Sequence, residues 1–293
     1  MGAWWNQSNG TFMKLIVESG ATKTAWRSVD ESGVLRSVQT AGLNPTCLDE
    51  DRCKDIVREA VPHLNPEGRQ VGEVFFYGAG LVSEESCAPI RAALEMWCPF
   101  AEIRFHSDLL AAARALFGDG SGIVAIMGTG SNSCLYSDGE IVSNIRSGGF
   151  IIGDEGSGAA LGKALMSDYV KGLLPEAVAK DLDDRYGLTY QQIVRRVYKE
   201  PGAAAFLASF APFVLEHLAE PSGYIRDMVS DCLEAFVRRA LSRYPGVKEV
   251  GVVGSFGCAC EGLLREAGAR YGLDFVKFVR NPVDELVSYH MNR

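Results

Sequence analysis

Short apolar runs and amphipathic segments alternate along most of the chain. The apolar runs, bounded by glycine or polar residues, predict strands at 14–17, 25–29, 34–38, 72–77, 101–105, 123–127, 133–136, 140–143, 248–253 and 274–279. Apolar residues at helical spacing predict helices at 49–63, 84–97, 109–117, 159–170, 225–242, 260–271 and 282–291, with a mostly helical stretch at 175–218. This alternation of strands and helices indicates an α/β protein.

The most informative stretch is 123–133, which reads I-V-A-I-M-G-T-G-S-N-S. A buried strand leads into a turn in which Gly128 and Gly130 flank Thr129. Glycine allows backbone conformations that other residues resist. Such a turn can direct backbone N–H groups and the hydroxyls of Thr129 and Ser131 at an anion. A plain β-hairpin that binds nothing explains the same pattern, and both interpretations stay open.

A second turn of similar chemistry lies near the start of the chain. Glu18 closes the first strand, and small residues including Gly20 lead into Thr22-Lys23-Thr24. This order resembles the first phosphate-binding hairpin of sugar kinases with the actin-like fold, in which the acid helps hold a hydrated Mg²⁺ and the small residues let backbone N–H groups approach phosphate. The alternative is an ordinary hairpin in which Lys23 is a solvated charge.

Two further positions carry polar groups next to predicted elements. Asn44 and Thr46, in a loop, suit a sugar hydroxyl or amide, or they form a polar turn that caps the following helix. Asp108 follows the strand 101–105, and ligands gather outside the carboxyl ends of strands in α/β sheets. Its position fits a catalytic base, although an N-cap of the next helix is the simpler interpretation.

Two glycine-rich junctions complete the candidate chemistry. In 147–158 the pair Asp154-Glu155 lies among glycines, and two buried acids at such a junction are costly unless they bind something. The alternative is an exposed loop whose acids cap the helix 159–170. The turn 254–257, between a strand and a helix, suits a nucleotide base or ribose, but it is also an ordinary α/β connection.

Composition narrows the class of protein. The 293 residues allow about two domains, and the flexible segment 118–122 is the natural boundary. A net charge of −8 argues against a nucleic-acid partner. No apolar run approaches the ~20 residues of a membrane span, and residues 1–12 are interpreted as a disordered leader. The eight cysteines include no C-x-x-C pair, which favours a reducing cytoplasm, with 258–260 a weak metal candidate. No repeat is visible.

The order of these motifs resembles the BadF/BadG/BcrA/BcrD ATPase family, and within it the N-acetylglucosamine kinase branch of the actin/Hsp70/hexokinase superfold. The motifs G-T-G-S-N and G-D-E-G-S are the most specific part of the resemblance. It implies two actin-like (ribonuclease H-like) α/β domains at 13–118 and 119–280, with mixed sheets flanked by helices and a cleft between the domains. A terminal helix at 281–293 would pack back on the first domain.

The resemblance also implies roles for individual residues. Glu18 would serve Mg²⁺, and Asp108 would be the base that accepts the proton of the attacking sugar hydroxyl. Residues implied to bind ATP are Gly20, Thr22, Lys23, Thr24, Gly128, Thr129, Gly130, Ser131, Gly254 and Ser255. Residues implied to bind an amino sugar are Asn44, Thr46, Asp108, Gly148, Gly149 and Asp154. The implied reaction is ATP-dependent phosphorylation of N-acetylglucosamine to its 6-phosphate, in the cytoplasm and commonly as a homodimer.

One departure from the family pattern keeps other functions open. The first loop reads Glu18-Ser19-Gly20-Ala21-Thr22, where the family usually begins Asp-Gly-Gly-Gly-Thr. Glutamate reaches one methylene further, although it can still contact a hydrated Mg²⁺. A sugar-binding sensor with weakened catalysis, a glucosamine or N-acetylmuramate kinase, and an iron–sulfur ATPase of the same family are the alternatives.

Overall fold

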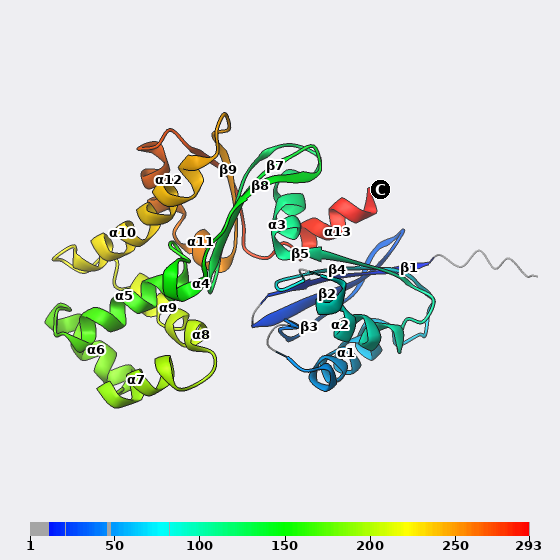
Figure 1. Cartoon of the computed structure of the whole chain (residues 1–293), viewed down its shortest axis with the longest axis horizontal. Coiled ribbons are helices and arrows are strands. Elements are labelled where there is room, and N and C mark those ends of the chain that lie inside the picture. Colours follow the sequence, from blue (N-terminus) through cyan, green and yellow to red (C-terminus); the bar gives the residue numbers. More distant parts are fainter. Residues whose placement is uncertain (1–11, 21, 46–47, 82, 293) are drawn as a thin grey trace, which may run out of the picture. The chain divides into compact units, whose positions relative to one another are not determined.

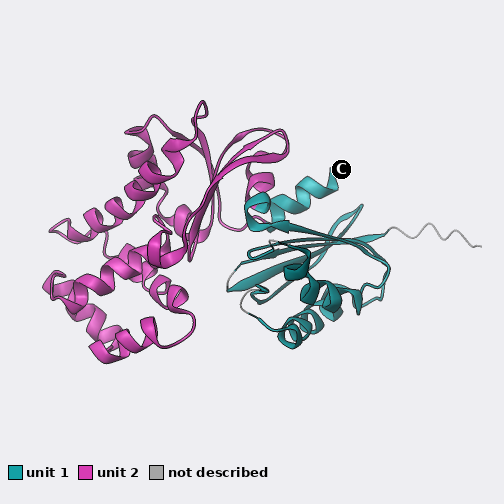
Figure 2. Ribbon diagram, in the orientation of Figure 1, with its two compact units in different colours: residues 1–111, 283–293 teal, residues 112–282 magenta. Residues whose placement is uncertain are grey.

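The computed structural model describes residues 12–20, 22–45, 48–81 and 83–292, and forms two compact units (Figure 2). Unit 1 comprises residues 1–111 and 283–293, and unit 2 comprises residues 112–282. Among the predicted features, Thr46 and almost all of the leader lie outside the described residues. The division between the units falls inside helix α3 (Asp108–Phe117), ahead of the glycine-rich segment at 118–122.

Unit 1 is built on a five-stranded mixed sheet with the order β3-β2-β1-β4-β5 (Figure 1). Its strands are β1 (Met13–Ser19), β2 (Lys23–Asp30), β3 (Gly33–Ala41), β4 (Val71–Gly78) and β5 (Glu102–Ser107). β1, β2 and β3 form an antiparallel meander, whereas β4 and β5 run parallel to β1. The strands alternate with α1 (Glu50–Leu64) and α2 (Glu84–Glu95), because parallel neighbours need crossover connections.

Two apolar layers cover the unit 1 sheet. The larger one packs α1 and α2 against one face, around the buried side chains of Trp26 and Phe76. The other face packs against α13 (Val283–Met291) through Val283, Leu286 and Val287. In this second layer the hydroxyl of Tyr77 lies 2.7 Å from Nε2 of His290, which joins the sheet to the last helix of the chain.

Unit 2 repeats the sheet of unit 1. Its strands are β6 (Gly122–Met127), β7 (Ser131–Ser137), β8 (Glu140–Ile145), β9 (Glu249–Val253) and β10 (Asp274–Val279). They are ordered β10-β9-β6-β7-β8. Here too the first three strands form an antiparallel meander, and the last two run parallel to the first. Each unit therefore begins with a hairpin at the centre of its sheet, β1–β2 in one and β6–β7 in the other.

Helices contribute most of the rest of unit 2. They are α4 (Gly149–Ile152), α5 (Gly158–Val170), α6 (Glu176–Tyr186), α7 (Tyr190–Tyr198), α8 (Ala203–Ala208), α9 (Ala211–Glu216), α10 (Tyr224–Arg239), the 3₁₀ turn η1 (Leu241–Arg243), α11 (Ser255–Ala259) and α12 (Glu261–Ala269). One continuous core joins these helices to β6 and β9. Close packing of α5 on α8 depends on Gly162, where an added Cβ would lie 1.8 Å from the carbonyl oxygen of Leu207.

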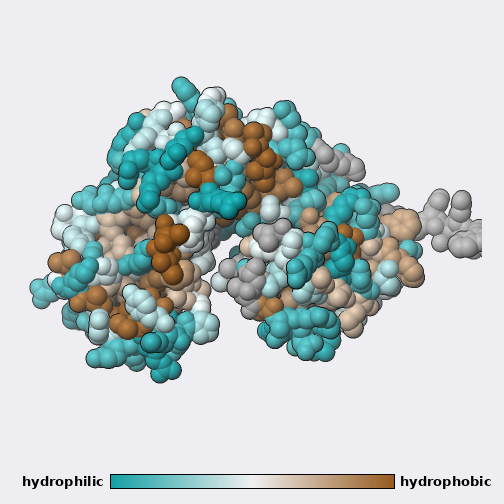
Figure 3. All heavy atoms as spheres, in the orientation of Figure 1, coloured by the Kyte–Doolittle hydropathy of each residue, from teal (hydrophilic) through white to brown (hydrophobic). Residues whose placement is uncertain are grey.

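The predicted fold class is confirmed: the chain is an α/β protein with two five-stranded mixed sheets flanked by helices. Most of the face drawn in Figure 3 is hydrophilic, and a hydrophobic patch lies over α4, where the side chains of Ile151 and Ile152 are 75% and 79% exposed. Among the described residues, no helix combines the length and the apolar character that a membrane crossing needs.

Candidate functional site

Side-chain hydroxyl groups fasten the β1–β2 hairpin of unit 1. Oγ of Ser19 lies 2.8 Å from Oγ1 of Thr24, and both oxygens accept the backbone N–H of Leu43 at 2.8 and 3.0 Å. The Thr24 hydroxyl also donates to the carbonyl oxygen of Ala41 at 2.9 Å. Both side chains are buried. Ser19 and Thr24 therefore fix the hairpin to the loop that carries Asn44, which is itself half-buried.

The residues at the tip of this hairpin lie closer to solvent. Thr22 and Lys23 are exposed, and the N–H of Gly20 donates across the turn to the carbonyl oxygen of Lys23 at 3.0 Å. The turn is therefore closed by the backbone and leaves the Lys23 ammonium group accessible to an anion.

Two carboxylates lie near the carboxyl ends of strands in the unit 1 sheet. The register aligns Glu18 of β1 with Tyr77 of β4, and Tyr77 with His106 of β5, just before Asp108. The strands β1 and β5 are thus two spacings, about 10 Å, apart. Burial, and then the negative charge of Asp108, raise the pKa of Glu18 to about 7, while Lys23 lowers it in part. Unit 1 brings Glu18, Lys23 and Asp108 within electrostatic reach of one another.

Asp108 occupies the first turn of α3. Ser107 makes the bond of an N-cap, because its hydroxyl accepts the N–H of Leu110 at 3.1 Å. Oδ1 of Asp108 accepts the N–H of Leu109 at 2.8 Å. Burial raises the pKa of Asp108, and the N–H groups at the helix start oppose that rise. The Asp108 carboxylate is therefore held in a fixed position, and it is not the group that caps the third helical residue.

Backbone hydrogen bonds to α5 fasten the corresponding β6–β7 hairpin of unit 2. The carbonyl oxygens of Gly128 and Thr129 accept the N–H groups of Gly158 and Ala159 at 2.9 and 3.0 Å. Within the described residues, the N–H groups of Thr129 and Gly130 have no acceptor in the protein. The Ser131 hydroxyl donates to the carbonyl oxygen of Glu155 at 2.7 Å. The turn therefore offers two N–H donors, while the Ser131 hydroxyl is already engaged.

The carboxylate of Asp154 packs against this second hairpin. It is 8% exposed and adopts a φ of 56°, unusual for a residue other than glycine. Burial raises the pKa of its carboxyl group, whereas hydrogen bonds from the Ser131 N–H and the Ser147 hydroxyl oppose that rise. A Cβ on Gly130 would lie 2.9 Å from Oδ2 of Asp154. Glycine at 130 is needed because the carboxylate packs directly on the turn.

The expectation of two buried acids in this loop is wrong for one of them. Glu155 is half-buried and turns outward to pair with Arg239. The competing interpretation, that the acids cap the next helix, fails as well, because the Ser157 hydroxyl accepts the N–H of Ala160 at 3.1 Å and caps α5. Asp154 and Glu155 therefore have separate partners and separate roles.

The remaining predicted residues of unit 2 divide between two places. Gly254, with a φ of 125°, is the N-cap residue of α11 and lies beside the second hairpin, where an added Cβ would lie 2.2 Å from the carbonyl oxygen of Met127. Ser255 is the first residue of α11. Gly148 and Gly149 are exposed and start α4 with φ values of 79° and 74°. Unit 2 thus gathers Gly128–Ser131, Asp154 and Gly254, and leaves Gly148 and Gly149 at the surface.

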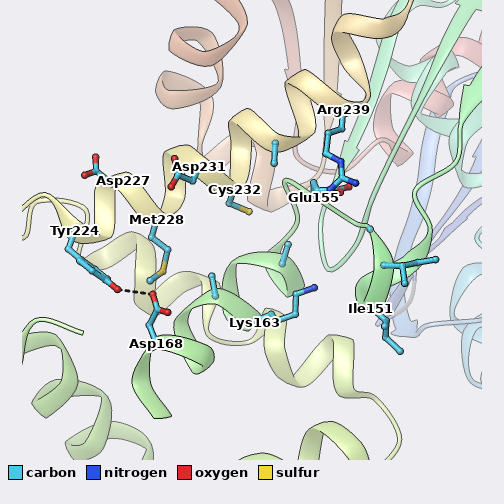
Figure 4. Close-up of a pocket in the computed structure, with 15 residues that line it drawn as sticks. Ile151, Glu155, Lys163, Asp168, Tyr224, Asp227, Met228, Asp231, Cys232 and Arg239 are labelled. Atoms are coloured by element: carbon cyan, nitrogen blue, oxygen red, sulfur yellow. Dashed lines mark hydrogen bonds and ion pairs between the residues drawn. The ribbon is translucent and has the colours of Figure 1, made fainter. Parts of the chain in front are cut away.

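Several contacts at this site could not be predicted from the sequence. In the sequence Ser147 is one small residue of a glycine-rich stretch, and its hydrogen bond to Asp154 requires the loop to fold back on itself. A cavity of about 690 Å³ lies between α5 and α10. Figure 4 shows residues that line it, among them Glu155 and Arg239, whose side chains point toward one another. None of the residues predicted to bind nucleotide or sugar lines this cavity.

The two cysteines of the iron–sulfur alternative, Cys258 and Cys260, lie where α11 meets α12. Burial raises the pKa of the Cys260 thiol to about 12, and that of Cys258 rises as well. In the part of the chain that the structure describes, no group of three or more His, Cys, Asp or Glu side chains is arranged to hold a metal ion.

Comparison with known proteins identifies relatives over nearly the whole chain. Residues 17–242 match the model of the BadF/BadG/BcrA/BcrD ATPase family. The crystal structure of a "putative N-acetylglucosamine kinase" from Porphyromonas gingivalis is 35% identical, with a TM-score of 0.90, over 96% of this chain and 99% of that chain. A search of curated proteins finds no match.

Two more distant structures share the fold. A "putative N-acetylglucosamine kinase" from Chromobacterium violaceum is 18% identical, with a TM-score of 0.75, over 97% of this chain and 100% of that chain. A ROK family glucokinase from Streptomyces griseus, in complex with glucose and AMPPNP, is 15% identical, with a TM-score of 0.55, over 94% and 97% of the two chains. At identities of 18% and 15%, these two structures show that the fold is shared and nothing further.

Proposed function

We propose a function from one premise: the chain belongs to the BadF/BadG/BcrA/BcrD ATPase family, as its motifs predicted. The proposed activity is ATP-dependent phosphorylation of an amino sugar, with N-acetylglucosamine as the acceptor and its 6-hydroxyl as the attacking group. Membership of an ATPase family supports the use of ATP, and the Porphyromonas gingivalis relative supports the choice of sugar.

The observation that carries this proposal is the pair of interacting carboxylates at the strand ends of unit 1. Phosphoryl transfer requires positioning and charge stabilisation, together with a group that accepts the proton of the attacking hydroxyl. Asp108 is suited to that task because it is fixed by the Leu109 N–H and its pKa is raised by burial. A general base works best when its pKa lies near the working pH.

Glu18 is suited to serve Mg²⁺. It is half-buried, its pKa is raised to about 7, and a second carboxylate contributes to that rise. A nearby cation would stabilise the charged form of both groups. Mg²⁺ keeps several of its waters and needs only one or two carboxylates from a protein. When bound, the ion would neutralise charge on the phosphates of ATP.

The proposed phosphate contacts are the N–H groups of Thr129 and Gly130, since neither has an acceptor within the described protein. Thr24 and Ser131 are better explained as positioning residues, because their hydroxyl groups are engaged with Ala41 and Glu155. Gly254 and Ser255 remain the proposed contacts to the nucleoside, and Asn44 and Asp154 the proposed contacts to the sugar.

The experiment is a coupled assay of ADP release with N-acetylglucosamine, glucosamine and N-acetylmuramate, with and without EDTA. We expect release that depends on N-acetylglucosamine and on Mg²⁺, and phosphorus NMR should identify a 6-phosphate. Saturable sugar binding without ADP release would contradict the proposal and favour the sensor. ATP hydrolysis that ignores all three sugars would contradict it as well.

A further inference from the structure

Four arginine side chains line a second cavity in unit 2, of about 480 Å³. Arg146 follows β8, Arg238 and Arg239 end α10, and Arg243 closes η1. The chain as a whole carries a net charge of −8. A concentration of positive charge in one hollow therefore runs against the overall charge balance of the protein.

The charges in this cavity are not balanced by the protein. Glu155 is the one carboxylate among its described lining residues, and it pairs with Arg239. Within the described chain, the guanidinium groups of Arg146, Arg238 and Arg243 form no ion pair. Like charges held around one hollow repel each other, and an anion bound between them relieves that repulsion.

Helix electrostatics account for only part of the cluster. Basic residues in the last turn of a helix complement its dipole, which explains Arg238 and Arg239 at the end of α10. Arg146 comes from the β8 side, and no helix end explains its presence there. The arginines thus converge from separate segments, as in a binding site.

Neutral donors line the same hollow. The amide oxygen of Asn132 accepts the side chain of Asn144 and the N–H of Ser133, both at 2.9 Å. The Asn132 NH₂ group has no acceptor within the described residues, so it is available to a ligand. Guanidinium and amide N–H groups together are the donors that carboxylate and phosphate oxygens prefer.

We propose that this cavity binds a small oxyanion, namely a carboxylate or a phosphate group. Its wall includes Ser131, Ser147 and Gly148, which belong to the loops proposed for ATP and sugar. The anion is therefore either a substituent of the acceptor sugar or a separate ion bound beside it. The binding site itself does not depend on the proposed kinase activity.

The first test uses inorganic phosphate as the probe and calorimetry on the full chain. We expect saturable binding to the wild type, weakened about 10-fold by Arg243→Gln and again by adding Arg146→Gln, because each loses a charge-assisted contact. Arg226→Gln is the matched control, since it removes the same charge from the other end of α10 and should leave binding unchanged. All of these arginines are exposed, so the variants should fold.

The second test separates the two sources of the anion. If the anion is a sugar substituent, Arg243→Gln lowers kcat/KM for N-acetylmuramate, which carries a carboxylate, about 10-fold more than for N-acetylglucosamine. If a separate ion binds, the variant loses phosphate binding and treats both sugars alike. Either outcome supports the site. The site would be overturned if the wild type bound no phosphate and Arg243→Gln lowered kcat/KM equally for the two sugars. It would also be overturned if Arg226→Gln weakened phosphate binding as much as Arg243→Gln does, whether or not the protein proves to be a kinase.

Discussion

The hairpins β1–β2 and β6–β7 occupy the same place in two sheets of the same topology, yet they carry opposite chemistry. The first places a carboxylate, Glu18, one residue before the end of β1, and it is fastened by buried hydroxyl groups. The second ends β6 with Met127, offers backbone N–H groups at Thr129 and Gly130, and is fastened by Asp154 and by bonds to α5. The first hairpin combines a carboxylate suited to a cation with the exposed ammonium group of Lys23, whereas the second offers backbone N–H groups suited to an anion.

This difference shows that the topology supplies a position and the local residues supply the function. In both units a turn follows the central strand, at the end of the sheet where the parallel strands have their carboxyl ends. Whether that end presents carboxylates or N–H groups depends on a few side chains. Substitutions that act on one hairpin and spare the other therefore test the assignment.

The largest effect on activity is expected from Asp108→Asn, at the pair of carboxylates in unit 1. Loss of the proposed base should lower kcat by about 10²–10⁴-fold, with the affinity for the sugar nearly unchanged. ADP release gives kcat, and calorimetry gives the affinity. The control is Asp138→Asn, in the exposed turn between β7 and β8, where asparagine suits the φ of 52°. Near-normal turnover of Asp108→Asn would remove this residue from the mechanism.

The next largest effect is expected from Gly130→Ala, in the turn of the β6–β7 hairpin. The new Cβ would lie 2.9 Å from Oδ2 of Asp154, so the buried carboxylate must move. Thermal unfolding should show a loss of about 2 kcal/mol, and nucleotide binding should weaken in the same variant. Gly262→Ala, in α12, meets no atom within 4 Å and should be neutral or slightly stabilising. A Gly130→Ala protein as stable as the control would show that Asp154 does not fasten the hairpin.

A smaller effect is expected from Thr24→Val, which tests how the first hairpin is fastened. The Leu43 N–H would keep one of its two acceptors, and the Ser19 hydroxyl would lose a partner. We expect a loss of about 1–2 kcal/mol in unfolding free energy and a higher KM for the sugar, because Asn44 follows Leu43. Thr24→Ser keeps the hydroxyl and should preserve the KM for the sugar. Equal stability and equal KM in the two variants would show that the Thr24 hydroxyl does not fasten the hairpin.

Periodicity predicted the strands and helices well, because buried strands and amphipathic helices leave patterns within one segment. The predicted run 123–127 lies within β6 at Gly122–Met127, and the predicted helix 159–170 lies within α5 at Gly158–Val170. The repeat of the sheet topology is not visible in the sequence, because two units of one chain can share a strand order without sharing residues. β1 ends in Glu18-Ser19 and β6 ends in Ile126-Met127, so the equivalent strands share no residue type at their ends.

Contacts between distant segments were beyond the sequence. The motif around Asp154 is visible in the sequence, but the hydrogen bond from the Ser131 N–H to its carboxylate depends on how a loop of unit 2 closes against a hairpin. The outward turn of Glu155 depends on Arg239, which lies on α10 and far along the chain. Local patterns carry no information on such partners, so two adjacent acids could not be told apart.

The smallest effect, and the one that depends on pH, is expected from Glu18→Gln. The pKa of Glu18 is raised to about 7 in the folded protein, above its ordinary value of 4.5. Between these values the folded state binds more protons than the unfolded state, so stability falls as pH rises. Since Glu18 is half-buried, we expect Glu18→Gln to be about 1 kcal/mol more stable than the wild type at pH 8, and equal to it at pH 4.

Thermal melts across that pH range, with and without Mg²⁺ and a non-hydrolysable ATP analogue, relate this effect to the proposed cation site. Bound Mg²⁺ would favour the ionised form of Glu18, so the wild type should gain more from the ligands at pH 8 than Glu18→Gln does. Glu31→Gln, in the exposed turn between β2 and β3, is the control and should follow the wild type. If Glu18→Gln gained as much from the ligands as the wild type, the acidic hairpin would not be the one that serves the cation.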